Sequence, residues 1–139
     1  MGKGHAQGFS LIELVMAILI LTVIIGMASA VYFKQARSGR RMDGINTIMA
    51  ISLAEEQYRS YNAAYGALAT VWTMGSTTPQ GFYTLAVSNV SATSYTVTAT
   101  GVGDQVNDTS SGTSCSPLVL TVNNATGTQT QTPAVCWPT

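Results

Sequence analysis

Glu13 is the residue whose type and position point most directly to a chemical role. It is followed by 20 uncharged residues, Leu14 to Phe33, in which the only clearly polar side chains are Thr22 and Ser29. An ionised carboxylate at the centre of a membrane-spanning helix costs about 2.5–3.5 kcal/mol, and less near the interface. We therefore expect Glu13 to have a cationic partner. The alternative is that it is an interfacial residue of an ordinary single-span anchor.

Two cysteines form the second candidate group. Cys115 and Cys136 both lie in the polar C-terminal part of the chain. In a membrane-anchored protein such a pair indicates an oxidising compartment and one disulfide, and two unpaired thiols are the alternative. Zinc needs more ligands, and the only histidine, His5, is far away in sequence. We predict no metal site and no cofactor.

No group of residues in the sequence predicts catalysis. The chain has no nucleophile elbow, phosphate-binding loop or metal-ligand cluster, so we predict no catalytic residues and no enzyme activity. Asp104 and Asp108 lie in a loop rich in Gly, Asn and Ser. Two carboxylates without a compact acidic loop are a weak calcium candidate, and we expect a solvated loop there.

Local basic charge is concentrated although the net charge is zero. Four of the six basic residues lie between Lys34 and Arg41. The bulk charge predicts no nucleic-acid partner. The cluster could contact lipid head groups, acidic residues of neighbouring molecules (Asp43, Glu55 or Glu56), or DNA, and a solvated face is the alternative.

One long helix must position Glu13 and the basic cluster. The apolar stretch is about 30 Å long as a helix, which matches the hydrocarbon core of a bilayer. It is too long for an ordinary secretory signal cleaved after residues 28–30. Apolar residues then recur at spacings of three and four, and Pro79 is the first proline. We predict a helix from about Phe9 to about Asn62. The residues expected on its apolar face are Met42, Ile45, Ile48, Met49, Leu53 and Tyr58.

The C-terminal half is predicted to form a small sheet. Residues 63–80 are expected to be a connecting loop, in which Tyr65 and Trp72 join Tyr58 and Tyr61 in the core. Runs rich in β-branched and aromatic residues predict strands at 82–87, 95–99 and 118–122, with a hairpin loop at 123–127 and a last edge strand at 135–137. The fold class is α+β, with an antiparallel sheet of three or four strands packed on the second half of the helix.

The segment Gly8-Phe9-Ser10-Leu11-Ile12-Glu13-Leu14, preceded by a short polar leader, resembles the class III signal peptide of type IV pilins and the related type II secretion pseudopilins. The resemblance implies that a prepilin peptidase and N-methyltransferase cuts between Gly8 and Phe9 and methylates the new amine of Phe9. It also implies that Glu13 pairs with this amine on a neighbouring subunit of the fibre. The pair within one chain, at i and i+4, is the alternative that we favour for the lone subunit.

The C-terminal end resembles the PilE-like subgroup of pilins. The residues that carry this resemblance are Cys115-Ser-Pro-Leu-Val-Leu-Thr-Val, Gly127 and Cys136-Trp137. The resemblance implies a disulfide between Cys115 and Cys136. It would close a ring of about 22 residues and contribute roughly 3 kcal/mol in the chain-entropy model.

Five segments follow for a pilin of this kind. They are a leader (1–8), a transmembrane and polymerisation helix (9–33), an amphipathic half-helix (34–62), a connecting loop (63–80) and a region with the sheet and disulfide (81–139). Many pilins have a proline where this chain has Ala30, so only Gly26 is left to soften the helix.

The resemblance implies a structural subunit that serves adhesion, twitching motility or DNA uptake. The subunit would cross the inner membrane once, with its N-terminus in the cytoplasm, and an assembly platform there would transfer it to an extracellular helical filament. Expected partners are copies of itself, other pilins and, before assembly, the lipid bilayer, with DNA or a host receptor as further candidates. The alternatives are a pseudopilin and a membrane-anchored adhesion or binding domain that does not polymerise.

Overall fold

The computed structural model describes residues 8–138, and the side chains of 27–30 are not among the described groups. Most of the predicted leader, including His5, therefore lies outside the described residues. The chain divides into two compact units, Met1–Phe33 and Lys34–Thr139. Helix α1, Leu11–Arg59, contributes to both units, which are described separately below.

The residues of helix α1 favour helix formation, and a side chain that follows it caps its C-terminal end. Leu, Ile, Met and Ala dominate its first half, and these are good helix formers. It begins two residues after Phe9 and ends three residues before Asn62, inside the predicted limits. At its C-terminal end the Asn62 side-chain amide donates to the Tyr58 carbonyl oxygen at 2.8 Å, which satisfies one of the last free carbonyls.

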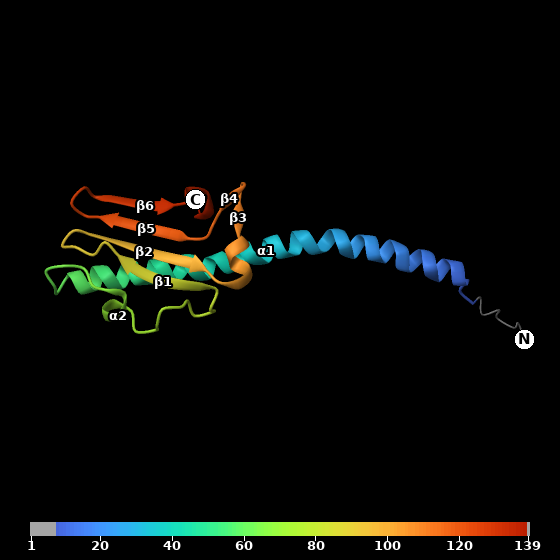
Figure 1. The fold of residues 1–139 in the computed structure, drawn as a ribbon, viewed down its shortest axis with the longest axis horizontal. Helices are drawn as coiled ribbons and strands as arrows, with labels where there is room; N and C mark the ends of the chain where they lie inside the picture. The colour runs from blue at the N-terminus through green and yellow to red at the C-terminus, as the bar shows by residue number, and fades with distance from the viewer. Residues whose placement is uncertain (1–7, 139) are drawn as a thin grey trace, which may run out of the picture. The chain divides into compact units, whose positions relative to one another are not determined.

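A four-stranded antiparallel sheet forms the other layer of Lys34–Thr139, as Figure 1 shows. Its strands, in spatial order, are β1 (Tyr83–Ser88), β2 (Ser94–Gly101), β5 (Leu118–Asn123) and β6 (Thr128–Thr132). In β1 and β5, buried residues alternate with more exposed ones, because successive side chains of a strand point to opposite faces. The predicted α+β fold, a long helix packed on an antiparallel sheet, is confirmed.

The edge strand predicted at 135–137 is wrong. These residues belong to a 3₁₀ turn, η2 (Ala134–Cys136), and to Trp137 after it. The edge strand is instead β6, with the sequence Thr-Gln-Thr-Gln-Thr. It forms a strand because its backbone pairs with β5 across the turn at 124–127. An edge strand needs no apolar side chains for that pairing.

Short elements fill the remaining connections. Helix α2, Leu68–Val71, lies within the segment predicted as a loop. A 3₁₀ turn, η1 (Gly103–Asn107), follows β2, and a two-stranded hairpin of β3 (Thr109–Ser110) and β4 (Thr113–Ser114) leads to Cys115. These elements place the loop that carries Asp104 and Asp108.

The helix face that meets the sheet matches the predicted one only in part, because Ile45 and Ile48 are buried as predicted but the face is rotated away from the other predicted residues. Ile45, Ile48 and Ile51 are buried against strand residues, while Met42 and Met49 are partly exposed and Leu53 is 72% exposed. Gly44 explains the difference, because a Cβ there would lie 3.0 Å from Cε2 of Tyr83. The glycine lets the sheet approach this side of the helix. The strand residues of the core are Tyr83, Leu85, Tyr95, Val97, Ala99, Leu118, Leu120 and Val122.

The predicted aromatic contribution to the core is correct only in part. Tyr65 is buried and its ring lies 4.5 Å from that of Tyr95, measured between centroids. Tyr58 and Trp72 are half-buried, whereas Tyr61 is 86% exposed. Tyr61 lies two residues beyond the end of α1, where its ring is exposed and outside the core.

Candidate functional site

The first candidate surface is the start of α1. Glu13 lies in the first turn of the helix, where a negative charge interacts favourably with the helix dipole. Its side chain is exposed and forms no ion pair within residues 8–138. Gly8 and Phe9 precede the helix and are exposed too, Phe9 by 85%. In this uncleaved chain Phe9 carries an ordinary backbone amide, so the cation expected for Glu13 would exist only after cleavage.

An exposed apolar surface follows Glu13. All described side chains of residues 14–26 and 31–33 are exposed, and almost all of them are apolar. The one clearly polar side chain among them, Thr22, donates its hydroxyl to the carbonyl oxygen of Leu19 at 2.8 Å. The helix is long and apolar enough to cross a membrane. A continuous apolar surface of this size marks contact with lipid or with other apolar helices.

The second candidate group is the basic cluster at the start of Lys34–Thr139. Arg37 donates from Nε and Nη2 to the two carboxylate oxygens of Asp104, at 2.9 and 2.6 Å. Arg40 approaches the same carboxylate at 4.0 Å, and its guanidinium lies 4.8 Å from the ring centroid of Phe82. The hydrogen bonds from Arg37 hold the pKa of Asp104 below its usual value. Exposed pairs of this kind contribute little to stability.

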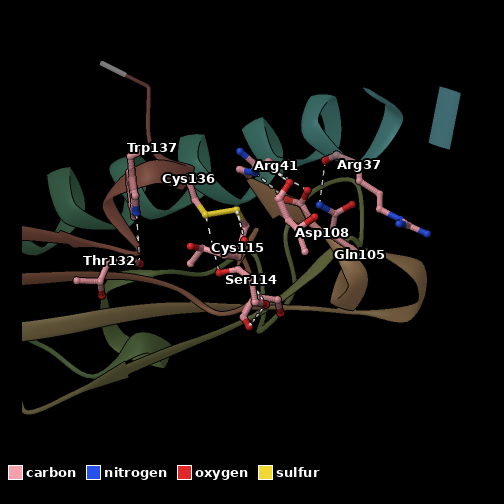
Figure 2. The surroundings of a disulfide bond; sticks show 12 residues. Arg37, Arg41, Gln105, Asp108, Ser114, Cys115, Thr132, Cys136 and Trp137 are labelled. Atoms are coloured by element: carbon pink, nitrogen blue, oxygen red, sulfur yellow. Dashed lines mark hydrogen bonds and ion pairs between the residues drawn. A yellow bond between two sulfur atoms is a disulfide. The ribbon is translucent and has the colours of Figure 1, made fainter. Parts of the chain in front are cut away.

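A second arginine of the cluster makes a buried pair. Arg41 donates from Nε and Nη2 to the carboxylate of Asp108, at 2.7 and 2.8 Å. The exposed fractions of the two side chains are 10% and 1%. The hydrogen bonds to Asp108 raise the pKa of Arg41, so the guanidinium stays charged. Figure 2 shows the two side chains facing each other beside the disulfide.

Gln105 joins the same loop to the helix. Its Nε2 atom donates to the carbonyl oxygen of Arg37 and to the hydroxyl oxygen of Tyr83, both at 2.9 Å. Burial raises the pKa of Tyr83 to about 12, so its hydroxyl keeps its proton at neutral pH. η1 and Asp108, which follows it, are therefore held by ion pairs with three arginines and by a buried amide.

These contacts correct one expectation and one of the alternatives. The loop with Asp104 and Asp108 is not a solvated loop, because Asp108 is buried and both carboxylates bind arginines. The cluster between Lys34 and Arg41 is not simply a solvated face, because Arg37, Arg40 and Arg41 interact with this loop. Both partners of each pair were visible in the sequence, but they lie 67 residues apart, and no local pattern couples them.

A disulfide joins Cys115 and Cys136 next to this loop. The Cα atoms are 5.6 Å apart, within the usual range for a disulfide, and both residues are buried. The backbone N–H of Cys115 donates to the carbonyl oxygen of Asp108 at 2.9 Å. The indole N–H of Trp137 donates to the carbonyl oxygen of Thr132 at 3.4 Å, which ties the chain end to β6 (Figure 2). The disulfide thus secures the segment that carries Asp108.

The surfaces described so far hold no catalytic or metal-binding arrangement. Among the described residues, no three His, Cys, Asp or Glu side chains come together in a way that could hold a metal ion. What the chain presents is an apolar helix with one acid at its head, and a compact α+β unit whose basic residues are largely paired.

Two known families match this chain. The family described as "Type IV minor pilin ComP, DNA uptake sequence receptor" matches residues 30–119. The family described as "Prokaryotic N-terminal methylation motif" matches residues 3–29. A comparison with curated proteins found no match. The two family matches adjoin and together cover residues 3–119, which include most of the predicted leader, all of α1, and strands β1 and β2.

Proposed function

Because this chain belongs to the type IV minor pilin family of ComP, we propose that it is a pilus subunit that acts in DNA uptake. The match over residues 30–119 is the observation that carries the proposal, since it extends over most of the α+β unit and not only over the common methylation motif. The family consists of structural subunits, not of enzymes.

Maturation is the first step of the proposed function. We infer that a prepilin peptidase removes residues 1–8 by cutting between Gly8 and Phe9, and that Phe9 is then N-methylated. The methylation motif at residues 3–29 supports this. The exposure of Gly8 and Phe9 outside the helix also supports it, because a peptidase needs access to extended backbone.

Membrane insertion and assembly form the second step. Residues 9–33 would cross the inner membrane once, with the N-terminus in the cytoplasm and Lys34–Thr139 on the side where disulfides form. The assembly platform would then move the helix from lipid into the fibre. Because both surroundings are apolar, close packing and charge pairing would supply the specificity.

The charge pair would set the position of each subunit in the fibre. Glu13 would bind the Phe9 amine of a neighbouring subunit, since an unpaired charge among apolar helices is costly. Repeating this head-to-tail contact gives a helical filament, because the contact surfaces differ and do not close a ring. Residues 34–62, 63–80 and 81–139 would then form the exposed part of the subunit.

The test combines the N-terminus of the protein with its location. Mass spectrometry of the purified protein should find N-methylphenylalanine at residue 9, whereas an intact Met1 or a start at Val31 would contradict the assignment. Glu13→Ala should remain in the membrane but disappear from sheared surface fibres. Glu56→Gln neutralises an exposed carboxylate of the α+β unit but keeps an oxygen that can accept from the Tyr65 hydroxyl, so it is the matched control and should be incorporated normally.

DNA uptake is tested separately from assembly. Deleting the gene should lower the uptake of labelled DNA at least tenfold while the cells still make surface fibres, as expected for a minor subunit. Wild-type uptake in the deletion strain would contradict the proposed role in uptake but leave the assignment as a fibre subunit standing.

A further inference from the structure

The two edges of the four-stranded sheet, β1 and β6, differ in what covers them (Figure 1). At the β1 edge, Thr78 donates its backbone N–H to the carbonyl oxygen of Tyr83 at 2.9 Å. Leu85 donates its N–H to the carbonyl oxygen of Ser76 at 2.8 Å. The loop before β1 therefore covers that edge, whereas no backbone hydrogen bond covers the outer side of β6 among residues 8–138.

The register of the sheet determines which backbone groups of β6 face outward. One residue beyond the paired ends of β2 and β5, Asn124 donates its N–H to the carbonyl oxygen of Thr93 at 2.7 Å. The backbone groups of successive strand residues point to opposite sides, so the even-numbered residues of β5 face β2 and the odd-numbered ones face β6. The partners of these odd-numbered residues are the even-numbered residues of β6. The N–H and C=O groups of Gln129 and Gln131 therefore point away from the sheet.

The residues of β6 leave its outer edge open to a further strand. Edge strands of natural proteins are often protected by charged side chains, a proline, a bulge or a covering segment. Residues 128–132 carry no charge and no proline, and their pairing with β5 runs without a bulge. All of them except Gln131 are exposed. Pro133, which has no N–H, limits the open edge to this segment.

We propose that β6 binds an extended, uncharged polar segment of a different pilin, which adds a fifth strand to the sheet. Extended polypeptide matches the donors and acceptors at Gln129 and Gln131, and the loop before β1 shows this match at the other edge. Thr128, Thr130 and Thr132 favour polar cross-strand neighbours such as Ser or Thr. The proposal rests on the proposed function, because a minor subunit has pilins of other kinds as its neighbours in the fibre.

Photo-cross-linking in assembled fibres tests the proposal. The photoreactive residue p-benzoylphenylalanine would replace Thr128, which is exposed at the start of β6. Irradiated sheared fibres should then contain a covalent adduct of this chain with another pilin, seen by immunoblotting of a denaturing gel. Mass spectrometry should locate the link in a partner segment that has no Asp, Glu, Lys or Arg.

Two substitutions at Gln131 separate backbone pairing from side-chain contact. Gln131→Pro removes the outward N–H but no bond to β5, so it should lower the yield of the adduct about fivefold or more, as expected when one backbone hydrogen bond is lost. Gln131→Ala removes the side chain and keeps the N–H. Its yield should stay within about twofold of the parent, because main-chain bonds supply the affinity when a strand is added.

Proline at two adjacent positions checks the register of β6. The N–H of Thr130 faces β5, so Thr130→Pro removes a bond of the sheet, whereas Gln131→Pro removes none. Thr130→Pro should therefore lower the free energy of unfolding more than Gln131→Pro, as measured by urea titration in detergent micelles. Equal losses would show that the N–H of Gln131 does not face outward and would overturn the proposal.

Other results would also overturn the proposal. They are an adduct with a second copy of this chain, a link to a charged segment, equal yields for Gln131→Pro and Gln131→Ala, and no adduct in fibres that contain the chain. Absence of the chain from sheared fibres would overturn the proposed function together with this proposal, and immunoblotting of that fraction identifies that case.

Discussion

Arg41 and Asp108 show how one residue pair can hold a loop on a helix. Because Asp108 is 1% exposed, removing its counter-ion would leave a buried carboxylate unpaired. We expect Arg41→Gln to lower the free energy of unfolding by about 3 kcal/mol, as is typical when one partner of a buried pair is lost. Urea titration in detergent micelles, followed by the fluorescence of Trp72 and Trp137, measures it.

The exposed pair next to it is the control. Arg37→Gln should cost less than about 1 kcal/mol, because Asp104 is 45% exposed and Arg40 remains nearby. The double variant Arg41→Met with Asp108→Leu should cost less than Arg41→Gln alone, because no charge is left buried. Equal losses of the free energy of unfolding for Arg41→Gln and Arg37→Gln would show that the buried Arg41–Asp108 pair contributes no more to stability than the exposed Arg37–Asp104 pair.

Glu55 is a buried acid whose ionisation should lower the stability of the fold. Burial raises the pKa of Glu55, the neighbouring Glu56 raises it further, and the N–H of Gly66, which donates to Oε2 at 2.8 Å, lowers it in part. An acid whose folded-state pKa is raised stabilises the fold fully below its unfolded value, about 4.3, and this stabilisation is lost as pH rises through the folded pKa.

Glu55→Gln should therefore change how stability depends on pH. Glutamine keeps an oxygen for the Gly66 N–H but cannot ionise, so the variant should be more stable than the parent at about pH 7 and similar to it at about pH 4. Urea titrations of both proteins across this range give the difference. A variant that is less stable than the parent at neutral pH would contradict the expectation.

At the scale of the elements, Gly39 and Gly44 look alike in the sequence but differ in the structure. Each weakens the helix by about 1 kcal/mol relative to alanine. A Cβ at Gly39 meets no atom within 4 Å, whereas a Cβ at Gly44 would lie 3.0 Å from Tyr83 and 3.2 Å from Leu118. We expect Gly39→Ala to raise the free energy of unfolding by up to about 1 kcal/mol, and Gly44→Ala to gain less.

Valine at the same two positions sharpens this comparison. Both substitutions introduce the same branched side chain into the same helix, so their intrinsic effects on helix formation cancel. Gly44→Val should be the less stable variant, because Tyr83 and Leu118 must move to admit it. Urea titration measures the difference, and equal stabilities would show that the sheet does not need the glycine for its approach to α1.

The sequence predicted the elements whose signals are local. The long apolar stretch and the alternation in the strands at 82–87, 95–99 and 118–122 depend on neighbouring residues, and they indicated α1, β1, β2 and β5. Strand β6 was missed because Thr-Gln-Thr-Gln-Thr has no apolar alternation. The orientation of α1 was predicted only in part, at Ile45 and Ile48, because Met42, Met49 and Leu53 offer a second apolar face. Gly44 decides between the two faces only once Tyr83 is in place.

Of the candidate site, the sequence predicted the short N-terminal motif but not the ion pairs between distant residues. Gly8, Phe9 and Glu13 form a short motif, so the sequence pointed to them without any fold, and their roles stay predictions. The ion pairs of Arg37, Arg40 and Arg41 join α1 to a distant loop. No local pattern predicts such contacts, because they depend on how the chain brings η1 beside the helix.

At the scale of the whole molecule, the charges of Lys34–Thr139 balance. This unit has five basic and five acidic residues, and Asp104 and Asp108 together bind three of its arginines. Affinity for DNA depends on cations that neutralise phosphates. A unit whose arginines already bind carboxylates has few cations left for this purpose, although its family is described as a DNA receptor.

We therefore expect weak DNA binding with a shallow dependence on salt. With Lys34 and Arg59 as the cations not paired with an acid among the described residues, the slope of log K against log salt should be about −2 or shallower. Asp104→Asn should tighten binding and steepen the slope by up to about two, because it releases Arg37 and Arg40.

Glu56→Gln changes the net charge equally but releases no arginine, so its slope should match the parent. Fluorescence anisotropy of a labelled duplex in detergent measures all three proteins. A parental slope near −6, or equal effects of the two substitutions, would mean that the loop pairs do not hold these arginines away from DNA.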